Sequence, residues 1–126
     1  MDHHPDRHLA VLAVLGDPRP MQALFAALRE QAIDVDVATS LADARSAFFG
    51  AGGHDCLVLG PDVGRGLAVR IMHSLRAVDP NLPTASFGPD VREDTACSRT
   101  AALSAYHPGS RAGTGALLRF LTDLRH

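Results

Sequence analysis

Short apolar runs alternate along this chain with segments whose apolar residues recur at helical spacing. Three of the runs end at a glycine that is followed by proline and aspartate, which are residues typical of strand ends and turns. The run that ends at Leu15 is uninterrupted, as expected of a strand covered on both faces. The pattern predicts five strands, at residues 8–15, 33–37, 56–59, 83–87 and 105–106.

The segments between these runs have the periodicity of amphipathic helices. Pro18 and Pro20 open the first of them, since proline suits a first helical turn. Ser40 is the predicted N-cap of the second, with Asp43 three residues later in a variant of the capping box. The predicted helices cover residues 21–28, 41–48, 67–78, 92–103 and 114–124, and the fourth is small and polar.

Strands that alternate with helices and are joined by short turns form a parallel sheet with helices on both faces. The functional crevice of such a sheet lies beyond the carboxyl ends of its strands. Three predicted strands end there in turns of similar composition, which are Gly16-Asp17-Pro18, Gly60-Pro61-Asp62 and Gly88-Pro89-Asp90. Any site in this protein is therefore expected at these turns.

Composition narrows the class of protein. The 126 residues suit one compact domain, predicted over 8–126 behind a flexible N-terminus at 1–7. The net charge of −2 and the pI near 6.3 argue against a nucleic-acid partner.

No apolar stretch approaches the roughly 20 residues of a membrane span, and no signal peptide is evident, so we expect a cytoplasmic protein. Two cysteines are too few for a disulfide framework, and Cys56 reads as a buried apolar residue.

Several fragments together resemble the receiver domains of response regulators, the CheY-like signalling modules of bacterial two-component systems. The segment 54–60, HDCLVLG, resembles the third strand of that family, and 34–44 resembles its second strand and second helix. Asp79-Pro80, Leu82-Pro83 and Tyr106-His107-Pro108 fall where the family has comparable residues. The resemblance implies a (βα)5, doubly wound, flavodoxin/CheY-like fold with strand order 2-1-3-4-5.

The family's functional residues are mostly replaced in this chain. A receiver holds Mg²⁺ with an acidic pair after strand one, and here that pair corresponds to Gly16 and Asp17. The phosphoacceptor aspartate corresponds to Gly60, the hydroxyl residue to Gly88 and the lysine to His107. Glycine offers no nucleophile, and the chain contains no lysine. The resemblance therefore indicates a pseudo-receiver that has lost phosphorylation, with Mg²⁺ binding lost or weak and no other cofactor or metal expected.

The aspartates of the three turns leave an alternative open. Asp62 lies two residues past the acceptor position, so it is a candidate for a displaced phosphoacceptor, and Asp17, Asp62 and Asp90 are candidates for an acidic pocket. Against this, aspartate after Gly-Pro is ordinary turn chemistry. His107 is either a pH-sensitive group or an exposed strand-end residue, and the bond before Pro108 is a candidate cis bond.

Three classes of function remain. The first is an interaction module that binds a protein partner or a second copy without phosphorylation, through the predicted fourth and fifth helices and fifth strand, with Arg99, Tyr106 and Arg119 as candidate contacts. The second is an atypical receiver phosphorylated on Asp62. The third, a small α/β enzyme, has the least support, since the chain has no nucleophile elbow or phosphate-binding loop. We expect a protein that is not an enzyme.

Overall fold

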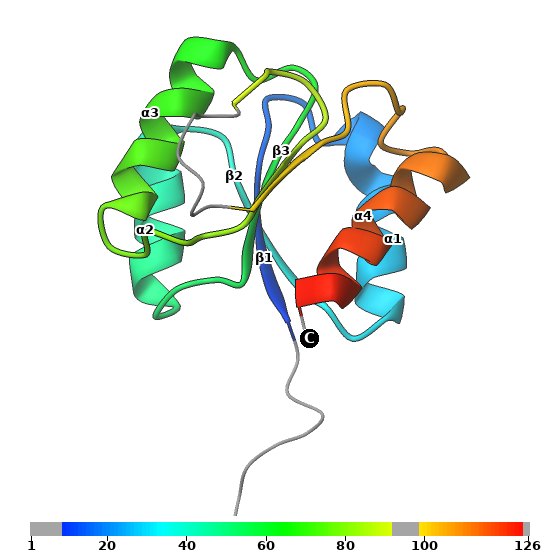
Figure 1. Ribbon diagram of the computed structural model, residues 1–126, viewed down its shortest axis with the longest axis horizontal. Helices are drawn as coiled ribbons and strands as arrows, with labels where there is room; N and C mark the ends of the chain where they lie inside the picture. The colour runs from blue at the N-terminus through cyan, green and yellow to red at the C-terminus, as the bar shows by residue number, and fades with distance from the viewer. Residues whose placement is uncertain (1–8, 92–98, 125–126) are drawn as a thin grey trace, which may run out of the picture.

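The computed structural model describes residues 9–91 and 99–124, which form a parallel sheet between two layers of helices (Figure 1). The strand order is β2-β1-β3-β4-β5, which confirms the predicted fold and topology. In Figure 1, α2 and α3 cover one face of the sheet, and α1 and α4 cover the other. The strands are β1 (Ala10–Val14), β2 (Asp34–Ala38), β3 (Cys56–Leu59), β4 (Thr84–Ser86) and β5 (Thr100–Ala102), and the helices are η1 (Arg19–Met21), α1 (Gln22–Glu30), α2 (Leu41–Gly50), α3 (Arg65–Arg76) and α4 (Arg111–Leu124).

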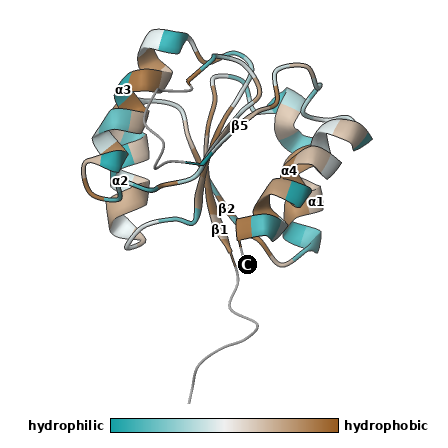
Figure 2. Ribbon diagram, viewed as in Figure 1, coloured by the Kyte–Doolittle hydropathy of each residue, from teal (hydrophilic) through white to brown (hydrophobic). Residues whose placement is uncertain are grey.

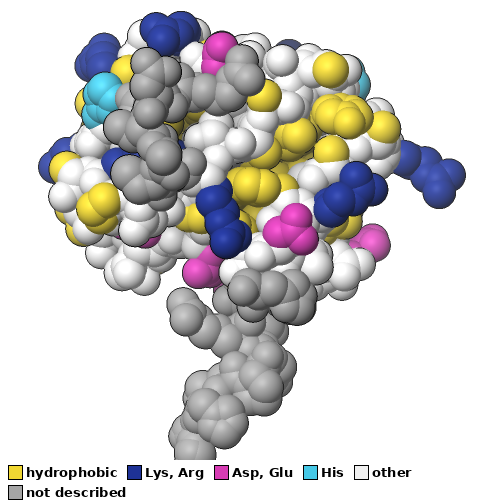
Figure 3. Space-filling view, viewed as in Figure 1, with side chains coloured by type: hydrophobic (Ala, Val, Ile, Leu, Met, Phe, Trp, Pro, Cys, Tyr) yellow, Lys and Arg dark blue, Asp and Glu magenta, His cyan; other side chains and the backbone are white. Residues whose placement is uncertain are grey.

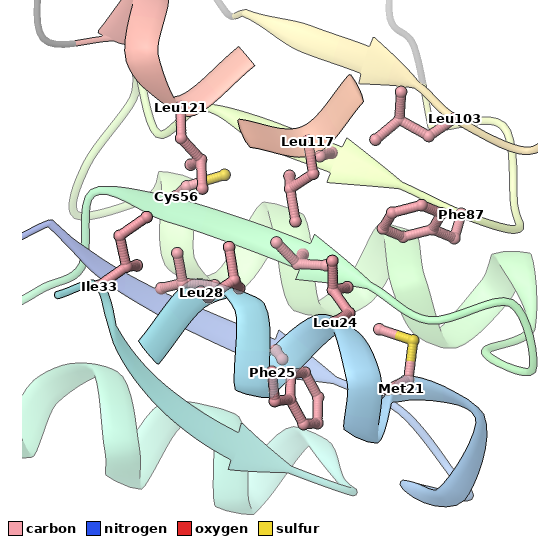
Figure 4. Packing of buried hydrophobic residues seen from close by; sticks show 14 of the residues in the cluster. Met21, Leu24, Phe25, Leu28, Ile33, Cys56, Phe87, Leu103, Leu117 and Leu121 are labelled. Carbon is pink, nitrogen blue, oxygen red and sulfur yellow. The ribbon is translucent and has the colours of Figure 1, made fainter. Parts of the chain in front are cut away.

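The central strands are apolar because both of their faces are covered. Every residue of β3 is buried, whereas edge strand β2 alternates aspartate with valine and keeps its carboxylates in solvent. Figure 2 shows hydrophilic and hydrophobic residues on the same helices, because each helix has one side toward the sheet and one toward solvent. Figure 4 shows Leu24 of α1 and Leu117 of α4 directed into the same cluster from opposite sides, with Leu121 of α4 beside Cys56 on β3. Burial of each such side chain stabilises the fold by about 1.5–3 kcal/mol.

Local signals set most of the element boundaries as predicted. Ser40 caps α2, because its Oγ accepts a hydrogen bond from the Asp43 backbone N–H at 3.0 Å. The two prolines open the short helix η1, which leads directly into α1. After α2 the chain reverses through Gly52 and Gly53, whose φ angles of 76° and 104° favour glycine. None of the helices described, in 9–91 or in 99–124, is long and apolar enough to cross a membrane.

The prediction is wrong around the fifth strand. Thr100–Ala102 is strand β5 and not the end of a helix over 92–103, and Ala105 and Tyr106 lie in a turn. Backbone pairing decides the difference, since Thr84 and Thr100 are register partners and the Thr84 N–H donates to the Arg99 carbonyl at 2.9 Å. Alanine favours helices over strands, so the pairing with β4 outweighs the local preference of Ala101 and Ala102. Residues 92–98, where the rest of that helix was predicted, and the predicted flexible N-terminus at 1–7 lie outside the described residues.

Candidate site at the carboxyl edge of the sheet

Three glycine-containing turns meet at the carboxyl edge of β1, β3 and β4. The register pairs Val14 with Leu59 and Leu59 with Ser86, so the strands end side by side. The Gly60 N–H donates to the Val14 carbonyl at 2.8 Å, which joins the second turn to the first strand. The sequence therefore placed Gly16, Gly60 and Gly88 correctly at one edge.

Asp62 is directed toward the first turn. Its Oδ2 accepts a hydrogen bond from the Asp17 backbone N–H at 2.6 Å, and its Oδ1 accepts one from the Gly16 N–H at 3.0 Å. A third contact joins the Gly16 N–H to Oδ2 at 3.1 Å. Hydrogen bonds to an ionised carboxylate are among the stronger ones in proteins. The Asp62 side chain therefore links the turn after β3 to the turn after β1.

Asp17 is directed elsewhere, toward Arg19. The Arg19 Nε and Nη2 atoms donate to its carboxylate at 3.0 Å each, and the Arg19 backbone N–H donates at 3.0 Å as well. These hydrogen bonds, chiefly that of the guanidinium, lower the pKa of Asp17 below its ordinary 3.8. The Asp17 carboxylate is therefore bound by the guanidinium of Arg19, two residues later in the chain.

The predicted acidic pocket is not assembled. Asp17 and Asp62 meet through a backbone N–H and not through their carboxylates, and the Asp90 carbonyl accepts a hydrogen bond from the Arg65 Nε at 3.1 Å. Within 9–91 and 99–124, no three histidine, cysteine or acidic side chains converge as ligands for a metal ion. The donor set at this edge does not fit the Mg²⁺ ion that a receiver fold implies.

Side-chain and backbone atoms of neighbouring residues fill the space around Gly60, Gly88 and Gly16. A Cβ atom on Gly60 would lie 2.9 Å from the Leu15 Cβ, and a Cβ atom on Gly88 would lie 3.0 Å from the Gly60 carbonyl oxygen. A Cβ atom on Gly16 would meet Asp62 Oδ2 at 2.7 Å. Real Cβ atoms avoid such separations, so these glycines permit a closer packing of the three turns than side chains would. Position 60 therefore has neither a side chain nor the room for one without a shift of its neighbours.

His107 lies in the turn between β5 and α4, exposed to solvent. Its Nδ1 accepts a hydrogen bond from the Gly109 N–H at 3.1 Å, and its carbonyl accepts one from the Ser110 hydroxyl at 2.7 Å. The bond to Pro108 is trans, as are all the peptide bonds described, so the cis candidate is wrong. The contacts of His107 shape the entry into α4.

The three candidate interface residues lie apart from one another. Arg99 precedes β5 and its Nη1 donates to the Asp123 carbonyl at 3.4 Å, whereas Tyr106 follows β5 and is 40% exposed. Arg119 is exposed on α4. The sequence did not point to three apolar residues of β5 and α4 that are only partly buried against the core, which are Ala101, Ala116 and Phe120. Figure 3 shows hydrophobic side chains gathered over the region that β5 and α4 occupy in Figure 1.

The available signal for that surface was Phe120. It lies three residues after Leu117, at the border of the stripe that contains the buried Leu117 and Leu121, and it is only partly buried although it is large and aromatic. We call Ala101, Ala116 and Phe120 the β5–α4 surface.

No protein family model matches this sequence, and no curated protein sequence does either. Among solved structures, a response regulator receiver protein from Sinorhizobium medicae superposes with a TM-score of 0.68 at 14% identity, over 94% of this chain and 95% of that one. Response regulator TrrA of Thermotoga maritima, in complex with Mg²⁺ and BeF, gives a TM-score of 0.63 at 16% identity, over 92% and 98%. Chemotaxis response regulator CheY4 of Vibrio cholerae gives 0.62 at 13%, over 94% and 99%. The chain has the fold of these receiver domains, as its sequence predicted.

Proposed function

We propose that this chain, which has the receiver fold, is a pseudo-receiver that signals by binding a protein partner or a second copy without being phosphorylated. The observation that carries the proposal is the closed packing around Gly60. Phosphoryl transfer to a receiver requires a carboxylate nucleophile and a cation that neutralises charge on the transferred group. Here the acceptor position has no side chain, and neighbouring atoms occupy the space one would need.

The cation requirement supports the same proposal. The two nearby carboxylates already have partners, since Asp17 pairs with Arg19 and Asp62 binds two backbone amides. A divalent ion would have to break these contacts before it was held by oxygen ligands. The geometry therefore favours lost or weak Mg²⁺ binding, no catalytic activity and a role in recognition.

The β5–α4 surface is the face we propose for the partner or second copy. Partly buried apolar side chains rimmed by arginines are common at protein interfaces. Arg99 and Arg119 lie within two residues of Ala101 and Phe120 along the chain, and Tyr106 follows β5, so these three residues are the proposed polar rim. The net charge of −2 gives no support to a nucleic-acid partner, and we place the protein in the cytoplasm, with other two-component signalling proteins.

Intact mass after incubation with Mg²⁺ and acetyl phosphate tests the proposal. We expect no added phosphoryl group, whereas a receiver with its acceptor aspartate gains one under the same conditions. A phosphoryl group that appears on the wild type and disappears in Asp62→Asn would establish the displaced acceptor instead. Beryllofluoride with Mg²⁺ should also leave the thermal midpoint unchanged, because a ligand stabilises only the state that it binds. A clear rise in the midpoint would contradict the proposal.

A further inference from the structure

We infer that the Asp62 carboxylate is a built-in ligand that latches the turn after β3 to the turn after β1. The contact joins positions separated by 45 and 46 residues in the chain, through the backbone N–H groups of Asp17 and Gly16. Both N–H groups converge on one side chain, so a single carboxylate fixes the position of the whole first turn.

The Gly16 and Asp17 N–H groups are donors, and the Asp62 carboxylate oxygens are acceptors. Gly16 and Asp17 lie in the turn between β1 and η1, and each has a backbone N–H that can donate a hydrogen bond. The Asp62 carboxylate supplies acceptor oxygens for both N–H groups from within the chain. Gly16 is required for it, because a Cβ atom at position 16 would lie 2.7 Å from Asp62 Oδ2 and displace the carboxylate.

The turn that carries Asp62 is held on its other sides as well. Gly60 donates to Val14 at 2.8 Å, the Val63 N–H donates to the Gly60 carbonyl at 3.3 Å, and Pro61 lies against Gly88 at the end of β4. The latch therefore acts on a turn that is already bound to two strands. The three turns around the former acceptor position form one connected unit.

The role of this latch in signalling rests on the proposed function. A switching receiver needs these turns to rearrange, and a bistable element is what a signal biases. Here an internal carboxylate occupies the amides of the first turn permanently. The protein would then present one constant conformation to its partner.

Backbone amide exchange tests the latch in the full chain. In the wild type, the Gly16 and Asp17 amides should exchange at least about tenfold more slowly than in an unstructured chain, although Gly16 is solvent-exposed. The variant Asp62→Ala should remove this protection, and formate, the smallest carboxylate, should restore part of it. Chloride at equal ionic strength should not. The matched control Asp17→Ala removes a carboxylate from the same turn but leaves the backbone N–H groups, so protection should remain.

Each result decides the question. Unprotected amides in the wild type would overturn the latch, even if Asp62→Ala does not fold. Protection that survives in Asp62→Ala, or a recovery that chloride produces as well as formate, would also overturn it. Restored protection with formate alone supports a carboxylate site at these amides. Phosphorylation of the chain would refute the proposed function without changing the wild-type amide result, so the two failures are distinguishable.

Discussion

His54 and Asp36 form a hydrogen bond of 2.8 Å between His54 Nε2 and Asp36 Oδ2, at the end of the sheet opposite the glycine turns. The imidazole side chain is only 1% exposed and stacks on the Phe48 ring, with centroids 5.8 Å apart. A carboxylate can only accept, so Nε2 carries the proton in this bond. Within the described chain, the buried Nδ1 has no hydrogen-bond partner. The pair therefore connects the segment before β3 to edge strand β2.

Replacement of His54 by alanine should destabilise the fold by roughly 2–4 kcal/mol, since it removes a buried ring and the hydrogen bond that this ring makes to a charged partner. The change Asp36→Asn keeps an acceptor oxygen and should cost less, roughly 0.5–1.5 kcal/mol. Asp34→Asn, on the same face of β2, is the control and should stay within about 0.5 kcal/mol. Urea denaturation measures all three. Equal losses for the two aspartate variants would show that the pair contributes nothing.

Gly88→Ala should destabilise the protein by roughly 1–3 kcal/mol, because the added methyl group would overpack the turns. It would lie 2.8 Å from the Pro61 carbonyl oxygen and 2.9 Å from the Pro61 Cα, and backbone atoms cannot move aside cheaply. Gly66→Ala is the control, since it lies within α3 with nothing inside 4 Å, and it should stabilise by about 0.5–1 kcal/mol. Thermal unfolding followed by circular dichroism compares them. A tolerated Gly88→Ala would mean that the turns are more loosely packed than the structure shows.

Gly60→Asp restores a carboxylate at the acceptor position but should not restore phosphorylation. The new side chain would begin 2.9 Å from the Leu15 Cβ and 3.4 Å from Asp62 Oδ1, so it would be crowded and close to a like charge. We expect a loss of stability and no mass gain with acetyl phosphate. Gly60→Ala separates the two causes, because it is crowded but uncharged. A variant that accepts a phosphoryl group would show that the side chain alone was missing.

Asp17 should contribute a small stability that depends on pH. The pKa of Asp17 is lowered below 3.8 in the folded state. Its contribution to stability is therefore fully present at a pH above its pKa in the unfolded chain, and it is lost as the pH falls through its pKa in the folded protein. The thermal midpoint of Asp17→Asn should therefore depend less on pH between about pH 5 and pH 2. Arg19→Gln should have the same effect, and the double variant should add little, since the two side chains form one exposed pair. Independent, additive effects would argue that the pair is energetically irrelevant.

Charge reversal should weaken self-association if a second copy binds the β5–α4 surface. Arg119→Glu and Arg99→Glu place repulsive charge beside Phe120 and Ala101, and each should raise the dimer dissociation constant about tenfold, as expected when a rim charge is reversed. Arg70→Glu is the matched control, because α3 covers the face of the sheet opposite α4. Sedimentation equilibrium measures the constants. If the three variants associate like the wild type, copies meet elsewhere or the partner is another protein.

Much of the fold was predictable because its signals are local. The uninterrupted apolar run of β3, the periodicity of α1 and the Ser40 cap each depend on residues within one or two turns of chain. The alternation of these elements leaves few topologies, and the right-handed crossover rule reduces them further. The glycine at position 60 was equally visible, since it is read directly from the sequence.

Contacts between distant segments were decided only by the tertiary structure. Thr100–Ala102 became a strand because β4 offered an edge to pair with, an interaction that no local propensity encodes. Asp62 looked like a turn residue or a displaced acceptor, and only its position beside amides some 45 residues earlier shows that it binds them. Periodicity specifies which face of an element is buried, but hydrogen bonds and steric contacts require coordinates in three dimensions. The sequence by itself therefore determined the architecture and the glycine at position 60, and the tertiary structure alone determined that the three turns pack too closely to leave room for a side chain there.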